Sequence, residues 1–248
     1  VSLEEDIPKI MAFFSHSLNP LRGEKPMLLA SYANVDDHST QEGTLPNQIF
    51  MHWNRQDLDE QANNRNFINQ TLWFFAHEVA HLYQPGNTDG VSENNEQSWL
   101  HEGNADYFAA LAMNFLYEDT SSYVESRTIR AFESCIEGLE QTTLANAYKT
   151  GHFNLYYSCG MIMHRAIDNV VQQKTFGEES LFTVWQRLQK AVSNLNAVLG
   201  DMHENHSRWL AHAGFVLPQH LTGEGLDNDF IQQSKSLEAA TIKAQENL

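Results

Sequence analysis

Residues 72–84 read LWFFAHEVAHLYQ, an apolar stretch that contains the segment His77-Glu78-Val79-Ala80-His81. Its periodicity predicts a helix over residues 66–83. Residues four apart lie on one face of a helix, so His77 and His81 can present two imidazole nitrogens to one zinc ion. Glu78 then lies beside the metal, where it can accept a proton from a zinc-activated water. The alternative is a chance pentapeptide whose histidines only cap or pack.

A second segment offers the third protein ligand that a catalytic zinc needs. Residues 99–107 read WLHEGNADY, and 20 residues separate His81 from Glu102. That length allows a turn and an antiparallel return, which would place Glu102 opposite the two histidines. Asp106 follows four residues later on the same helical face, where it could accept the free N–H of a ligand histidine and fix its tautomer. The sequence therefore predicts one Zn²⁺ per chain.

Together the two segments resemble the gluzincin zinc peptidases, and within them the aminopeptidase-N-like family. That family has H-E-x-x-H, a spacer of similar length, and then W-L-N-E-G-F-A-E-Y. In this chain His101 replaces the Asn, Asn104 replaces the Phe, and the acid at position 106 is Asp106. The resemblance implies a thermolysin-like catalytic domain in which His77, His81 and Glu102 bind zinc and Glu78 is the general base.

A third segment adds a candidate oxyanion donor. Residues 157–160 read YSCG and resemble the family's Y-x-K-G, whose tyrosine hydroxyl donates to the oxyanion of the tetrahedral intermediate. The 75 residues between His81 and Tyr157 are a separation similar to the family's. The resemblance implies this catalytic role for Tyr157, with the adjacent Tyr156 as the rival. A tyrosine at the start of a helix can also be a packing residue.

One motif of the family is altered. Its aminopeptidases carry G-x-M-E-N on an edge strand, where the Glu binds the free α-amine of the substrate. Residues 43–47 of this chain read GTLPN, so Pro46 stands in place of that Glu. A proline also removes a backbone N–H from any strand that would pair with substrate. The choice between exopeptidase and endopeptidase activity therefore stays open.

Outside these motifs, the pattern predicts an α+β domain that spans the whole chain. An amphipathic helix over residues 3–17 precedes two short extended segments, 26–33 and 47–53, which are separated by a polar connection. We expect residues 1–63 to form a small α/β part and residues 64–248 to form a helical lobe. Its further helices are predicted at 98–117, 122–138, 143–150, 154–173, 179–194 and 201–212.

Composition narrows the classes of function. The chain of 248 residues is long enough to bury a core, and its formal charge of −17 argues against nucleic acid as a partner. No run of apolar residues is long enough for a membrane span. Cys135 and Cys159 are too few for a disulfide scaffold and are expected to be core residues, so they leave the redox compartment open.

The sequence is most consistent with a zinc peptidase acting on peptides or proteins. Two alternatives remain: an inactive gluzincin-fold binding or scaffold protein, and a zinc hydrolase of a non-peptide substrate. No signal peptide is visible, and both an exported mature chain and a fragment of a larger protein would begin this way. Oligomeric state and compartment are not predicted.

Overall fold

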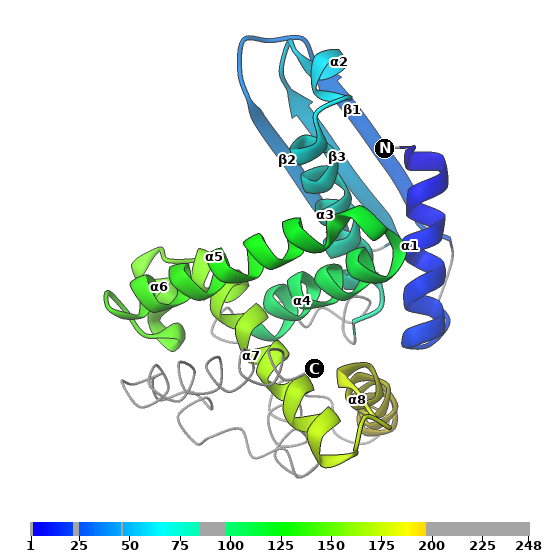
Figure 1. The fold of residues 1–248 in the computed structure, drawn as a ribbon, viewed down its shortest axis with the longest axis vertical. Helices are drawn as coiled ribbons and strands as arrows, with labels where there is room; N and C mark the ends of the chain where they lie inside the picture. The colour runs from blue at the N-terminus through cyan, green and yellow to red at the C-terminus, as the bar shows by residue number, and fades with distance from the viewer. Residues whose placement is uncertain (1, 22–24, 46, 85–97, 197–248) are drawn as a thin grey trace.

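The computed structural model describes residues 2–21, 25–45, 47–84 and 98–196, and these form an α+β arrangement as predicted (Figure 1). A three-stranded sheet and helix α1 (Leu3–Ser17) come from the first part of the chain, and helices make up the rest of the described residues. The predicted helix at 201–212 and the residue Pro46 lie outside the described residues.

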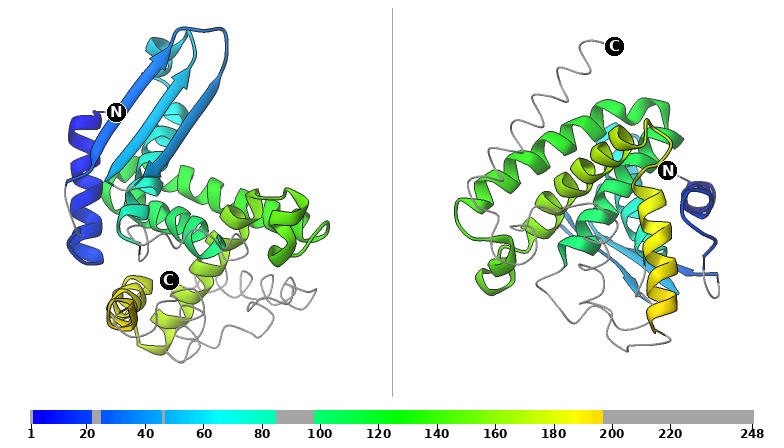
Figure 2. Two further views of the ribbon diagram at one scale, coloured as in Figure 1. Left: turned by 180° about the vertical axis from the view of Figure 1, so that it is seen from behind. Right: turned by 90° about the horizontal axis from the view of Figure 1, so that it is seen from below.

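Helix α1 follows its predicted bounds and buries one face, formed by Ile7, Ile10 and Phe14. It runs beside the β1 edge of the sheet, as Figure 1 and the left view of Figure 2 show. Strands β1 (Met27–Ala33) and β3 (Gln48–Asn54) pair in parallel at the two predicted extended segments. Strand β3 alternates buried and half-buried residues because its core-facing side chains are Ile49, Met51 and Trp53.

Strand β2 (Ser39–Leu45) corrects the prediction that a polar connection separates two strands. It pairs antiparallel with β3 and forms one edge of the sheet, whose order is β1-β3-β2. Its sequence STQEGTL lacks an apolar alternation because the strand buries little. Gly43 lies opposite Phe50, whose ring fills the space that a side chain at position 43 would occupy. Cross-strand pairing, which local sequence does not reveal, makes this segment a strand.

The long helices after the sheet agree with their predicted ends to within two residues. The helix predicted at 143–150 consists of two short elements, 144–146 and 147–150, and the short elements at 58–61 and 118–120 were not predicted. Helix α3, the first long one, begins after Asn64, whose side-chain oxygen accepts from the backbone N–H groups of Asn66 and Phe67. It covers one face of the sheet (Figures 1 and 2). The elements are α2 (Leu58–Gln61), α3 (Arg65–Leu82), α4 (Trp99–Leu116), η3 (Glu118–Thr120), α5 (Ser121–Leu139), η4 (Leu144–Asn146), α6 (Ala147–Thr150), α7 (Asn154–Lys174) and α8 (Leu181–Asn196).

Helices α4 and α7 cross at two glycines, and among the described helices this pair is the most extensively packed. A Cβ atom built on Gly103 would lie 2.2 Å from the backbone of Gly160, and one built on Gly160 would lie 2.6 Å from the carbonyl oxygen of Trp99. Backbone therefore meets backbone at this crossing. Because Gly103 directly follows Glu102, the crossing also fixes the position of that carboxylate.

Replacing Gly103 with alanine is expected to force α4 and α7 apart, because the added methyl group meets backbone that has no rotamer to change. Overpacking of this kind costs about 1–3 kcal/mol, and we expect the upper end of that range or more. Urea denaturation measures the loss. Gly138→Ala is the matched control, since its methyl group would meet the side chain of Leu155 instead. Equal behaviour of the two variants would contradict this account.

The two cysteines form a disulfide, which the sequence did not predict. Cys135 on α5 and Cys159 on α7 are both buried, as expected of core residues, and their sulfurs are bonded. Only the packing of α5 against α7 brings together two residues that are 24 positions apart in sequence. The bond ties α7 to α5 next to the glycine crossing.

Removing this disulfide with the pair of substitutions Cys135→Ala and Cys159→Ala is expected to lower the free energy of unfolding by about 3 kcal/mol. A loop of this length loses roughly that much chain entropy when it is closed in the unfolded state. Urea denaturation with and without reductant provides the measurement. Reductant should destabilise the native protein and leave the double variant unchanged. An effect on both would mean that the disulfide is not the cause.

Candidate metal centre

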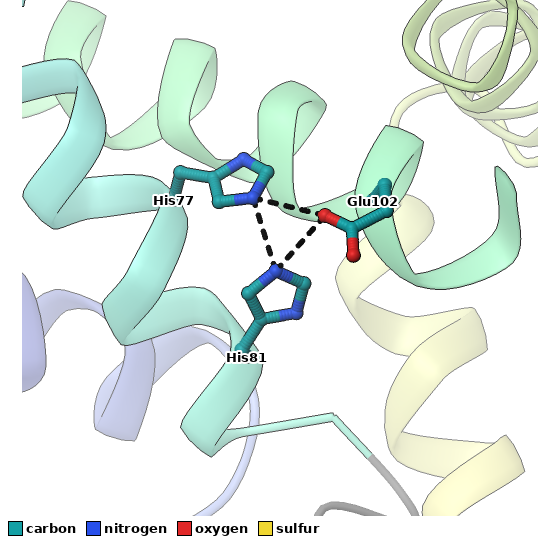
Figure 3. A group of neighbouring side chains, drawn as sticks. All are labelled: His77, His81 and Glu102. Carbon is teal, nitrogen blue, oxygen red and sulfur yellow. Dashed lines mark hydrogen bonds and ion pairs between the residues drawn. The ribbon is translucent and has the colours of Figure 1, made fainter. Parts of the chain in front are cut away.

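His77, His81 and Glu102 converge at the junction of α3 and α4, with both histidines on one helix and the carboxylate on the other (Figure 3). The Nε2 atoms of the two histidines are 3.0 Å apart, and Glu102 Oε2 lies 3.2 Å from His77 Nε2 and 3.3 Å from His81 Nε2. Four ligands around zinc at 2.0–2.1 Å are about 3.3–3.4 Å apart. The three donors therefore could hold a metal ion, and their spacing and chemistry fit zinc.

Asp106 lies where the helical spacing predicted, directly behind His77. Its Oδ1 is 2.9 Å from His77 Nδ1 and also accepts a hydrogen bond of 2.8 Å from the indole N–H of Trp73. The guanidinium of Arg127 stacks over the Trp73 ring at 4.5 Å and adds a positive charge near the buried carboxylate. These contacts hold the Nδ1–H form of His77 and direct its Nε2 toward Glu102.

Burial alone would shift the pKa values of His77 and Glu102 toward their neutral forms, but the contacts of these residues with their charged neighbours outweigh that effect. Burial lowers the pKa of His77, but its hydrogen bonds to Asp106 and Glu102 raise that pKa to about 10. Burial raises the pKa of Glu102, yet the two histidines bring it well below its usual range. Without metal, the site is thus a compact ion pair, and a metal ion that binds here must displace the proton from His77.

Glu78 does not belong to the group of converging donors. It is buried, and its Oε2 accepts a hydrogen bond of 2.6 Å from the hydroxyl of Thr44 on strand β2. The same hydroxyl lies 2.9 Å from the backbone carbonyl of Glu78. Edge strand β2, which the sequence did not predict, thus positions the carboxylate of the expected general base.

Tyr157 and Tyr156 have different surroundings. The Tyr157 ring stacks on His77 with centroids 5.8 Å apart, and 40% of the residue is exposed. Burial and the neighbouring carboxylate of Glu102 raise the pKa of Tyr157, so its hydroxyl stays protonated. Tyr156 is 3% exposed and packs in the hydrophobic core. The structure therefore brings Tyr157, and not its rival, to the candidate metal centre.

Three polar residues near the centre were not singled out from the sequence. Glu42 lies on β2 two residues before Thr44, and one of its carboxylate oxygens is buried with no hydrogen-bond partner in the part of the chain that the structure describes. Gln84 and Asn104 are buried, with Gln84 in contact with His81 and Asn104 in contact with Gln84. For Asn104, the departure from the family's Phe was a signal in the sequence. Glu42 and Gln84 could not be recognised from the sequence, because their places near the centre depend on contacts between elements.

No model of a known protein family matches the chain, and no curated protein is significantly similar to it. The resemblance to gluzincins therefore rests on the motifs and on the geometry of the residues that carry them. Among the helices of the described residues, none is long and apolar enough to cross a membrane.

Proposed function

We propose that this chain is a zinc-dependent peptidase with a thermolysin-like catalytic domain, similar to the aminopeptidase-N-like gluzincins. The observation that supports it best is the convergence of His77, His81 and Glu102 beside a buried carboxylate, Glu78, that is not among the converging donors. Three protein ligands leave a fourth position for water or substrate, which is the arrangement of catalytic rather than structural zinc sites.

In this proposal each side chain has a separate task. A bound zinc ion would polarise the scissile carbonyl and lower the pKa of water to about 7. Glu78, held by the Thr44 hydroxyl, accepts the proton of the attacking water and passes it to the leaving amine. The protonated hydroxyl of Tyr157 donates to the oxygen on which negative charge develops, a contribution on the order of 3 kcal/mol.

The alternative of an inactive binding or scaffold protein is less well supported. Binding a partner does not require a carboxylate that is buried and oriented by a neighbouring hydroxyl, as Glu78 is by Thr44. Burial of such a group costs stability unless it is paired. Hydrolysis of a non-peptide bond uses the same residues, and the identity of the cleaved bond is therefore part of the test.

Substrates with a cationic group are favoured by the charge near the centre. Glu42 has a buried, unpaired carboxylate oxygen, and burial together with the nearby charge of Glu78 raises the pKa of Glu42. A positive substrate group beside Glu42 would favour its charged form and pair with it. The net charge of −17 would also attract cationic peptides.

The buried disulfide favours an oxidising compartment, as in exported proteins.

Elemental analysis of the purified protein, paired with cleavage of a mixed peptide library, tests the proposal. We expect about one zinc per chain, loss of cleavage after chelation, and recovery when zinc is added back. The library should include free and acetylated amino termini, so that it also separates exopeptidase from endopeptidase activity. Bound zinc without cleavage would favour the scaffold alternative, and the absence of bound metal would overturn the site.

A further inference from the structure

A chain of amide hydrogen bonds lies behind His81, on the side away from the converging donors. Gln84 Oε1 is 2.8 Å from His81 Nδ1, and Gln84 Nε2 donates to the backbone carbonyl of His101 at 2.8 Å and to Asn104 Oδ1 at 3.1 Å. Gln84 and Asn104 are 7% and 0% exposed. The chain links the end of α3 to the first turns of α4, the two elements that carry the candidate metal ligands.

The partners of Gln84 determine which way its amide faces. A carboxamide nitrogen only donates, and its oxygen only accepts. Because the carbonyl of His101 and Oδ1 of Asn104 take up both N–H groups of Gln84, its oxygen must face His81. That oxygen can contact His81 Nδ1 favourably only when Nδ1 carries the hydrogen. In the neutral ring, the form that binds a metal, the lone pair of His81 is then on Nε2, the atom that points toward His77 and Glu102.

Asn104 shows that this orientation has a cost. Its Nδ2 is buried and has no hydrogen-bond partner among the described residues. An unpaired buried donor costs about 1–3 kcal/mol, and an apolar side chain at this position would avoid the cost. The hydrogen bond that Asn104 Oδ1 accepts from the amide of Gln84 offsets this cost.

We propose that Gln84 and Asn104 form a positioning pair that locks His81 in its Nδ1–H tautomer and presents Nε2 to the metal. The pair is neutral, whereas the corresponding partner of His77 is the carboxylate of Asp106. The two histidines are thus held by different chemistry, and only one of them receives extra negative charge. This inference rests on the metal site proposed above.

Two variants of nearly conserved size test the pair. Gln84→Met removes all three hydrogen bonds, and Asn104→Leu removes the acceptor that orients Gln84. Loss of such partners typically weakens metal binding by about 10–100-fold. We expect an increase in the zinc dissociation constant within this range for Gln84→Met and a smaller increase for Asn104→Leu. Competition with a chromophoric chelator measures both constants. Asn69→Leu is the control, because it too removes a buried amide, here one on α3 eight residues before His77, and should leave zinc affinity unchanged.

Nitrogen-15 chemical shifts of the histidine rings in metal-free protein provide the second measurement. We expect Nδ1 of His81 to carry a hydrogen throughout the native sample and to lose it in part of the Gln84→Met sample. Unchanged zinc affinity and an unchanged tautomer in Gln84→Met would overturn the inference. If the native chain binds no zinc but its His81 shows the expected tautomer, the proposed function fails and the lock on His81 stands.

Discussion

Replacing Glu78 with glutamine is expected to leave bound zinc at about one per chain and to reduce peptide hydrolysis by about 10²–10⁴-fold, the contribution of a positioned general base. Glutamine keeps the shape of the side chain and an oxygen that can accept from Thr44, so the fold should not change. It cannot accept the proton of the attacking water. Turnover of the best library peptide and elemental analysis of the same sample give the two numbers.

The control for this variant is Glu133→Gln, which removes a carboxylate from the exposed face of α5 and should change neither number. Loss of zinc in Glu78→Gln would show that Glu78 is a ligand instead of a base. Full turnover in Glu78→Gln would remove the general base from the mechanism.

Replacing His81 with alanine should abolish stoichiometric zinc binding and, with it, hydrolysis. Only His77 and Glu102 would remain, and catalytic zinc sites have three protein ligands. Dialysis against a zinc buffer followed by elemental analysis should show well under one zinc per chain. Thermal unfolding with and without zinc should also coincide, because a ligand that does not bind gives no stabilisation.

His152→Ala is the matched control for this loss. This histidine hydrogen-bonds Thr150 and Gln141 away from α3 and is not one of the converging donors. The variant should retain zinc and the zinc-dependent shift in unfolding temperature. Zinc retained at full occupancy in His81→Ala would refute the ligand assignment.

The helices and the converging donors could be predicted because their signals are local. Apolar residues at intervals of three and four define α3, whereas α4 is a mostly apolar run that is buried on nearly every side. The four-residue spacing of His77 and His81 fixes their relative direction on any helix. The return of Glu102 to the same point required only a spacer long enough for an antiparallel turn. Asp106 followed from the same helical geometry.

The features that the sequence did not predict depend on contacts between distant segments. Strand β2 is polar and exists because it pairs with β3, so the contact of Thr44 with Glu78 was not visible. The bond between Cys135 and Cys159 requires the packing of α5 on α7. The role of Gln84 depends on its amide reaching the backbone of a helix that begins after an intervening stretch of chain.

The glycine crossing of α4 and α7 joins the two backbone segments that carry Glu102 and Tyr157. Glu102 directly precedes Gly103, and Tyr157 lies less than one turn of helix before Gly160. In most of a protein core, neighbouring side chains can adjust to a substitution by changing rotamer. At this crossing the contact is between two backbones, so no rotamer change can adjust it. The spacing between the Glu102 carboxylate and the Tyr157 phenol is therefore set by two helix backbones in direct contact. Changing that spacing requires a change in the path of α4 or α7, which a side-chain substitution elsewhere in the core does not provide.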